Sequence, residues 1–485
     1  MPARLAVEEE VRGPRSAAVD ALNLFSVMWA LAALWHLLGN PSGAPMPARA
    51  LLTLGIGIVL WRPGAVGPLG VLAVGGLATV WGEAPVLGNH WLLVGFVDLA
   101  IVVAIGVGIV RRHPMDRAGF ARRLFPVARL CLLAFYGFAA FAKLNTAFFD
   151  RSVSCAVFYF RESTSSLGLA GLQLGGAGWV EWAAIVGSVS VELSIPVLLV
   201  RRRTRHLGVV VGLLFHGVVA LDRSHQFFDF SSVLAALFLL FLPAEAGTWV
   251  AERAGSVRAR ILLRDERGPT VVHAIAVALA VAIAAACTLD QIDAREGVDV
   301  GWVPWQIYTA IVILAVLRFL RERPRAAGRT MLRPAHVLLL VVPALVVFNG
   351  LTPYLELKTG YGWTMYSNLR TVDGDSNHLL VRAALPLTDE QADPVRIVST
   401  DAPGLQGYAR SDFALTWRQL RAFMSRHPED AITYERAGER VVLTRAADDP
   451  DLVRPVSPWL EKVALFRAID LTSPERCVPT FGPAR

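Results

Sequence analysis

Residues 129–150 read RLCLLAFYGFAAFAKLNTAFFD and place a lysine, Lys143, at the end of a long apolar run. A run of this length can cross a bilayer as a helix, and a charged side chain within it is costly. Lysine is also rare in this chain. Only three lysines occur among the 47 lysine and arginine residues: Lys143, Lys358 and Lys462. The position of Lys143 therefore calls for a physical explanation.

The composition around this run is that of a polytopic membrane protein, with 54% hydrophobic and 18% charged residues. We predict an all-α membrane bundle of about nine to eleven transmembrane helices. The predicted spans are 17–39, 48–61, 66–82, 91–110, 124–145, 178–200, 206–221, 229–248, 270–289, 303–320 and 334–350. The second and third are short and glycine-rich, and could form one re-entrant pair. We interpret 17–39 as a first span rather than as a removed signal peptide.

Arginine clusters alternate with segments that are nearly free of positive charge. The basic segments are 111–123, 201–205, 251–267 and 318–333, and the alternate segments are 83–90, 146–177, 222–228 and 290–302. By the positive-inside rule this alternation predicts a multi-pass protein of the cell membrane with a cytoplasmic N-terminal segment, residues 1–16. Residues 17–350 would form the transmembrane domain. The net charge of +7 then reflects contacts with membrane lipids, not with nucleic acid.

Residues 351–485 are mostly polar and predict a small extracytoplasmic α+β domain. We expect strands at 378–385, 395–400 and 462–469 and a hairpin within 432–445. A helix is expected after an N-cap at Ser411 and before Pro428. Cys155 and Cys477 both map outside, where they could form a disulfide or remain two thiols, whereas Cys131 and Cys287 fall in spans as small hydrophobic residues.

Several polar residues of different spans fall in one layer near the outer face. They are His90, Asp98, Lys143, Glu181, His216 and His225. Each also has a structural explanation: Lys143 can extend to the interface, and His216 can pack with its ring bonded to a carbonyl. Glu192, near the membrane centre, could be a hydrogen-bonding residue or part of a proton relay, and we favour the first. No metal-ligand spacing, phosphate loop or serine-nucleophile motif is evident, so no metal is expected.

The segments FAAFAKLNTAFF (138–149), GNHWLLVGFVDL (88–99) and VELSIPVLLVRRRTR (191–205), followed by GLLFHGVVALDRSHQFFDF (212–230), resemble the vitamin K-dependent γ-carboxylase family. That family includes bacterial members with the HTTM (horizontally transferred transmembrane) domain. The ordered matches cover roughly residues 15 to 250. Residues 349–381 resemble a stretch of bacterial HTTM-type proteins, to which no chemical role is assigned. Phe148 stands where the family usually has a tryptophan.

The resemblance implies that Lys143 is a base that deprotonates a reduced quinone of the vitamin K or menaquinone type, with His90 as a hydrogen-bonding helper and His216 as a supporting group. O2 and CO2 would be cosubstrates, for epoxidation or coupled carboxylation. We predict that Tyr136, Asn89 and Asp98 contact the quinone. An extracytoplasmic protein or peptide is a further expected substrate, although the small outer domain argues against protein-glutamate carboxylation.

Two other function classes remain open at this point. The first is a non-catalytic membrane protein whose outer domain binds a partner or an envelope component. The second is an outward-facing transferase with a lipid-linked substrate, which lacks support because no paired carboxylates or metal motif occur.

Overall fold

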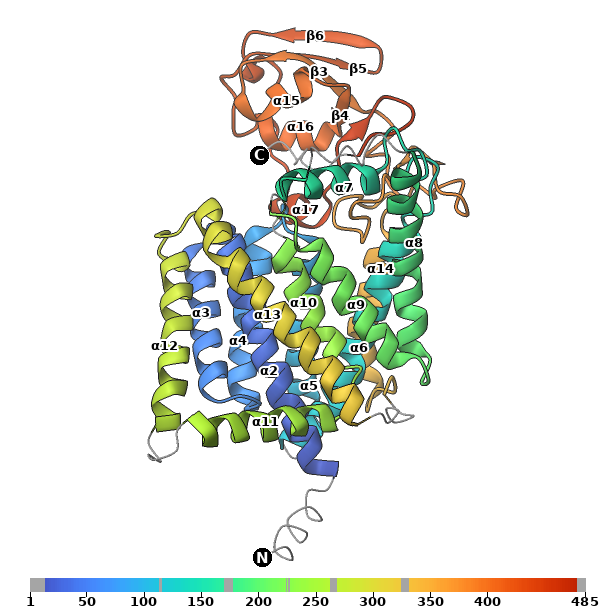
Figure 1. Cartoon of the computed structure of the whole chain (residues 1–485). Coiled ribbons are helices and arrows are strands. Elements are labelled where there is room, and N and C mark those ends of the chain that lie inside the picture. The colour runs from blue at the N-terminus through green and yellow to red at the C-terminus, as the bar shows by residue number, and fades with distance from the viewer. Residues whose placement is uncertain are drawn as a thin grey trace, which may run out of the picture. The chain divides into compact units, whose positions relative to one another are not determined.

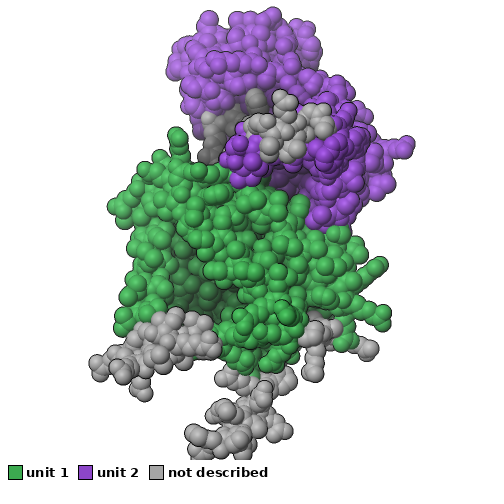
Figure 2. Space-filling model, in the orientation of Figure 1, with its two compact units in different colours: residues 1–83, 90–134, 194–346 green, residues 84–89, 135–193, 347–485 purple. Residues whose placement is uncertain are grey.

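The computed structural model describes residues 14–112, 116–169, 178–223, 225, 227–261, 268–323 and 331–477. Contacts divide the chain into two compact units (Figure 2). Unit 1 comprises Met1–Glu83, His90–Ala134 and Ser194–Val346, and unit 2 comprises Ala84–Asn89, Phe135–Leu193 and Val347–Arg485. The domain boundary predicted near residue 350 divides the apolar from the polar part of the sequence. It does not correspond to the division into these two units, and it stays a prediction. Residues 1–13 of the predicted N-terminal segment, and parts of the basic segments, lie outside the described residues.

Helices dominate the described residues as far as residue 351 (Figure 1). Their bounds are α2 Pro14–Gly39, α3 Met46–Trp61, α4 Val66–Glu83, α5 Asn89–Val110, α6 Arg117–Phe141, α7 Cys155–Ser166, α8 Gly178–Val200, α9 Arg205–Val219, α10 Phe227–Leu239, α11 Glu245–Ile261, α12 Gly268–Thr288, α13 Ala294–Glu322 and α14 Val341–Leu351. Seven of them are long and apolar enough to cross a membrane: α2, α4, α5, α6, α8, α12 and α13. Each of the eleven predicted spans overlaps one of these seven or one of four shorter apolar helices.

Unit 1 is built around α2, which contacts α3, α4, α10, α11, α12 and α13. The glycine-rich helices α3 and α4 cross closely, and two glycines make this possible. A Cβ at Gly55 would overlap the backbone of Leu72, and a Cβ at Gly75 would overlap the backbone of Leu52. Small residues let helix backbones approach in this way within apolar surroundings. The glycines of this region therefore serve helix packing.

Unit 2 contains a five-stranded antiparallel sheet with the strand order β6-β5-β3-β4-β7. The strands are β3 Val395–Thr400, β4 Phe413–Leu415, β5 Ile432–Arg436, β6 Glu439–Leu443 and β7 Ile469–Asp470, and a separate pair is formed by β1 Thr371–Val372 and β2 Asp375–Ser376. Leu420, Phe423 and Met424 of α16 (Trp417–Met424) share one core with Val395 and Ile397 of β3. A small sheet region at the C-terminal end, as expected from the sequence, is thus present.

The hairpin prediction is confirmed, because β5 and β6 are joined by Ala437 and Gly438. Both residues have positive φ, 51° and 80°, as a tight hairpin turn requires. The strand at 395–400 is also confirmed.

Three expectations for this region are wrong. Residues 378–385 form only isolated bridges, because His378 Nδ1 accepts the N–H groups of Leu380 and Val381 and so holds a turn. The helix cap is Thr416, which forms a capping box with Gln419, and not Ser411, because β4 occupies the intervening residues. Within 462–469 the chain ends a short helix, and strand β7 starts only at Ile469.

A disulfide joins Cys155, the first residue of α7, to Cys477, across a sequence separation of 322 residues. Both cysteines belong to unit 2. The backbone N–H of Cys477 also donates to the carbonyl of Val153 at 3.2 Å, so the end of the described chain is held by two bonds. Of the two alternatives for this pair, the structure shows the disulfide, whereas Cys131 and Cys287 are buried free thiols.

We predict that replacing both Cys155 and Cys477 by serine lowers the stability of unit 2 by about 2–4 kcal/mol, because the cross-link restricts the unfolded chain. Thermal unfolding in detergent measures the loss, and mass spectrometry of an unreduced digest measures the bond. Cys131→Ala, which removes a thiol that forms no disulfide, is the control for the digest and should leave the linked peptide unchanged. Alkylation of both Cys155 and Cys477 without reduction would contradict the assignment.

Candidate functional site

Lys143 forms a buried ion pair in unit 2. It lies two residues beyond the end of α6, and its side chain is only 6% exposed. Nζ lies 2.7 Å from Oε2 of Glu192 on α8 and also donates to the carbonyls of Ala139 and Met365, both at 3.4 Å. These three acceptors match the three N–H bonds of an ammonium group. From the sequence we predicted a functional role for Lys143 and a separate structural role for Glu192. In the structure the two side chains are partners.

Asn145, two residues further on, fixes the turn that carries Lys143. Its side-chain nitrogen donates to the carbonyls of Ala142, at 2.8 Å, and of Ser367. Its Oδ1 accepts the N–H of Phe148 at 2.8 Å. Asn145 is fully buried, so losing these bonds would leave polar atoms without partners. The asparagine of the Lys-Leu-Asn sequence therefore positions the lysine.

The segment 349–381 supplies the other side of this turn. The carbonyls of Met365 and Ser367 accept bonds from Lys143 and Asn145. The Nε2 of His378 donates to the carbonyl of Phe141 at 2.9 Å, since its Nδ1 is occupied as an acceptor. The backbone N–H of Leu379 donates to the carbonyl of Leu144 at 2.8 Å. A segment without an assigned role in the sequence thus encloses the lysine turn.

The backbone of this segment is unusually strained. Six of its residues other than glycine have positive φ values between 48° and 59°: Glu356, Tyr361, Trp363, Tyr366, Asn368 and Asp373. Each such residue costs on the order of 1–3 kcal/mol, and such residues gather at functional sites. Met365 and Ser367, whose carbonyls face the lysine turn, stand between three of them. The strain thus coincides with the contacts to Lys143 and Asn145.

A second polar cluster lies in unit 1 and consists of two histidines and two carboxylates. Asp229 Oδ2 is 2.9 Å from His36 Nδ1 and 2.8 Å from His90 Nε2. The other ring nitrogen of His36, Nε2, is 2.8 Å from Glu83 Oε1. His36, Glu83 and Asp229 are buried, and the side chain of His90 is 18% exposed. The ring of Trp91 stacks on that of His36 at 3.4 Å.

All four members of this cluster stand at helix ends. His36 lies three residues before the end of α2, and Glu83 is the last residue of α4. His90 is the second residue of α5, and Asp229 is the third residue of α10. Of these four residues, only His90 was predicted from the sequence. The other three could have been predicted as well, because each lies at the outer end of a predicted span or in the adjoining outer segment.

The remaining predicted site residues have other surroundings. His216 is 4% exposed on α9, and its ring packs on Phe230, which also contacts the ring of His90. Asp98 accepts a hydrogen bond from Trp29 at 2.9 Å, beside a cavity of about 10 Å³ that has room for about one water. Asn89 accepts the N–H of Trp363 at 3.3 Å, and Tyr136 is 3% exposed on α6.

The predicted residues are distributed over both units. Lys143, Tyr136 and Asn89 belong to unit 2, and His90, His216 and Asp98 belong to unit 1. Comparisons of the chain with protein-family models, with curated proteins and with solved structures find no match. The resemblance to the γ-carboxylase family, and the quinone contacts expected of Tyr136, Asn89 and Asp98, therefore stay predictions.

The packing around Asp98 yields a stability prediction. A Cβ at Gly76 on α4 would collide with the Asp98 carboxylate and displace it from Trp29. Gly76→Ala should lower the free energy of unfolding by about 1–3 kcal/mol, as overpacking of a core does. Thermal unfolding in detergent measures the change. Gly106→Ala, on the helix of Asp98, meets no atom within 4 Å and should be neutral. Equal effects of both changes would refute the packing argument.

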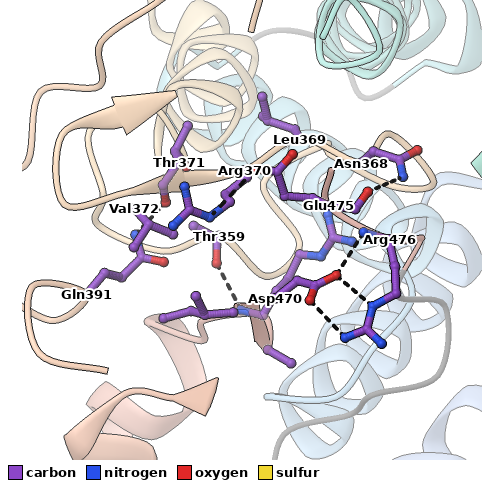
Figure 3. Close-up of a pocket in the computed structure, with 13 residues that line it drawn as sticks. Thr359, Asn368, Leu369, Arg370, Thr371, Val372, Gln391, Asp470, Glu475 and Arg476 are labelled. Carbon is purple, nitrogen blue, oxygen red and sulfur yellow. Dashed lines mark hydrogen bonds and ion pairs between the residues drawn. The ribbon is translucent and has the colours of Figure 1, made fainter. Parts of the chain in front are cut away.

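A pocket of about 40 Å³ lies within unit 2 and is large enough for about three waters (Figure 3). On its wall Asp470 accepts two hydrogen bonds from the Arg476 guanidinium, at 2.9 and 3.0 Å. Asp470 also accepts bonds from the N–H of Arg476 and from Thr472. Burial alone would raise the pKa of Asp470, but these bonds together hold it below its usual value. The carboxylate thus fastens the chain next to Cys477.

We predict that Asp470→Asn destabilises the protein by about 1–3 kcal/mol at pH 7. Because the pKa of Asp470 is lower in the folded than in the unfolded protein, its contribution is present above pH 4 and is lost as the pH falls through the folded value. The difference between wild type and variant in denaturant unfolding should therefore shrink below pH 4. Asp401→Asn, at an exposed position, is the control. A difference that is unchanged down to pH 2 would contradict the ion-pair explanation.

Proposed function

We propose that the chain is a multi-pass protein of the cell membrane, with its N-terminus in the cytoplasm and its C-terminal α+β domain outside. Three observations support this topology. Seven described helices are long and apolar enough to cross a membrane. The arginine clusters alternate along the sequence as the positive-inside rule requires. A disulfide joins Cys155 and Cys477, and disulfides persist in oxidising compartments. The proposed topology places both cysteines outside the cytoplasm, where the surroundings are oxidising.

Within this protein we propose an enzyme of the γ-carboxylase-like class that acts on a lipid-soluble quinol. The observation that carries the proposal is the 2.7 Å contact between Lys143 and Glu192, with both side chains largely shielded from solvent. The contact places a carboxylate where it can accept a proton directly from the Lys143 ammonium group. Lys143 is thereby held in place next to a proton acceptor.

The proposed step is a proton transfer. The proton of the Lys143 ammonium passes to Glu192, and the amine then takes a hydroxyl proton from the quinol, which leaves a quinolate. The resemblance implies that O2 next oxidises the quinolate, with epoxidation or coupled CO2 transfer. Asn145 and the carbonyl of Met365 keep Nζ in one position throughout. His90 as helper and His216 as supporting group remain predictions that rest on the resemblance.

The purified protein is tested with reduced vitamin K and menaquinone analogues under oxygen, with quinol loss and epoxide formation followed by chromatography. Lys143→Arg should reduce turnover by at least about 100-fold, because a guanidinium does not lose its proton at accessible pH. Lys143→Met should be equally inactive. Lys462→Arg makes the same chemical change at a lysine outside the site and should retain activity.

The variant Glu192→Gln distinguishes a general-base role of Lys143 from a purely structural role of its ion pair with Glu192. Stability should fall in Lys143→Met and in Glu192→Gln, and should recover in the double variant, because a lone buried charge is costlier than none. Under the proposal, Glu192→Gln keeps measurable turnover that Lys143→Arg lacks. Full activity of Lys143→Arg would refute the general-base role. Wild-type protein that consumes none of the quinols would refute the quinol chemistry.

A further inference from the structure

We propose that His36, His90 and Asp229 bind a divalent transition-metal ion in unit 1, with Glu83 as a positioning residue. The ligand atoms are His36 Nδ1, His90 Nε2 and a carboxylate oxygen of Asp229, and all three lie within 4.8 Å of one another. The site is independent of the Lys143 chemistry. In this proposal His90 is a metal ligand and not a helper in quinol chemistry. The proposal also departs from the sequence-based prediction, which expected no metal.

The distances suit a small ion after a modest adjustment. The ligand atoms of a four-coordinate Zn²⁺ site with bonds of about 2.0–2.1 Å stand about 3.3 Å apart. Asp229 Oδ2 is now 2.9 Å from His36 and 2.8 Å from His90, so the carboxylate needs to withdraw by about half an ångström, and the two histidine nitrogens, which lie within 4.8 Å of each other, need to reach the same ligand separation. Asp229 Oδ1 is buried and has no hydrogen-bond partner in the described part of the chain. Oδ1 therefore has no hydrogen bond to lose when it binds an ion, whereas the two contacts of Oδ2 with the histidines are replaced by bonds to the ion.

The orientation of His36 is that of a metal ligand with a supporting carboxylate. In a metal-bound form, Glu83, 2.8 Å from Nε2, would hold the proton on that nitrogen, and Nδ1, which faces Asp229, would supply the lone pair for the ion. A carboxylate bonded to the far nitrogen of a ligating histidine is the usual support of such a site. The stacked ring of Trp91 holds the imidazole in its plane. Glu83 and Trp91 therefore pre-position one ligand.

Charge balance also favours a cation. The cluster holds two buried carboxylates, whose side-chain partners in the described residues are the two imidazoles. Glu83 Oε2 and Asp229 Oδ1 are both buried without partners there. Two buried carboxylates need compensating positive charge, which the two imidazoles supply when protonated and which a bound cation would supply in their place. A dication at the three ligand atoms neutralises both carboxylates and gives Asp229 Oδ1 a partner.

The type of ion follows from the ligands. Two imidazoles and one carboxylate suit Zn²⁺ or Fe²⁺ rather than Mg²⁺ or Ca²⁺, which prefer oxygen ligands alone. Three protein ligands leave a coordination position open, as in catalytic rather than structural zinc sites. The partial exposure of His90 provides access to that position. The competing explanation is a network of protons shared among the same four side chains without a metal.

The test uses full-length protein purified in detergent with an affinity tag that contains no histidine. After removal of metal with a chelator, Zn²⁺ is titrated and bound metal is counted by elemental analysis. We expect one equivalent in the wild type. Asp229→Asn and His36→Gln should weaken binding by at least about 100-fold, and Glu83→Gln by about 10–100-fold. His225→Gln removes a histidine of the same unit that pairs with Asp222, and should not change binding.

Two readouts on the wild type keep the test decisive even where a variant folds poorly. Co²⁺ in the site should give the visible absorption of a low-coordinate ion with nitrogen ligands, and excess Zn²⁺ should abolish it. Zn²⁺ should also raise the thermal midpoint of wild type and His225→Gln but not of folded Asp229→Asn. Wild-type protein that takes up well below one equivalent would overturn the metal site and leave the proton network. Undiminished affinity in folded Asp229→Asn would overturn it as well.

Discussion

The buried pair of Lys143 and Glu192 is the interaction on which the candidate active region depends. An ammonium group among apolar helices is tolerated only with an opposite charge and hydrogen-bond acceptors within reach. Glu192 supplies the charge from α8, and the carbonyls of Ala139 and Met365 supply the acceptors. Each of these partners needs its backbone at a fixed place. The strained course of residues 356–373 and the buried side chain of Asn145 both serve that requirement.

The same constraint explains the cluster in unit 1. Carboxylates at the ends of α4 and α10 would be costly there unless bonded, and they are bonded to histidines from α2 and α5. In both units the charged side chains thus come from different helices and meet only in the folded chain. The four cluster residues of unit 1 stand at helix ends, where a polar group is less deeply placed than at the centre of a helix, whereas Glu192 lies well inside α8.

The helices were predictable because apolar runs of adequate length are a local property of the sequence. The β5–β6 hairpin was predictable for a similar reason, since its Ala-Gly turn favours positive φ. The site was predictable only in part. The rarity of lysine drew attention to Lys143, but its pairing with Glu192 links positions 49 residues apart. His36, Glu83 and Asp229 carry no local motif, and only the packing of four helices shows that they are neighbours.

In one of the failed local predictions, a side chain replaced the expected backbone pairing. His378 binds two N–H groups that a strand would have used, and the 378–385 segment became a turn that holds the lysine loop. The reverse happened before α16: the residues ahead of Thr416 pair through their backbone with β3 and β7, so the helix starts later than the expected cap at Ser411. Such competition between side-chain and backbone bonds cannot be judged from hydrophobic periodicity.

The bond between Cys155 and Cys477 has a consequence for the life of the chain. It encloses α7 to α14 and the whole C-terminal sheet in one covalent ring. During synthesis, the second cysteine is added 322 residues after the first, so the ring can close only after α7 to α14 and the C-terminal sheet have been made. Once it has closed, a protease cut at any single peptide bond between the two cysteines opens the ring but leaves both pieces attached. A cut in a loop between the two cysteines therefore does not release either piece.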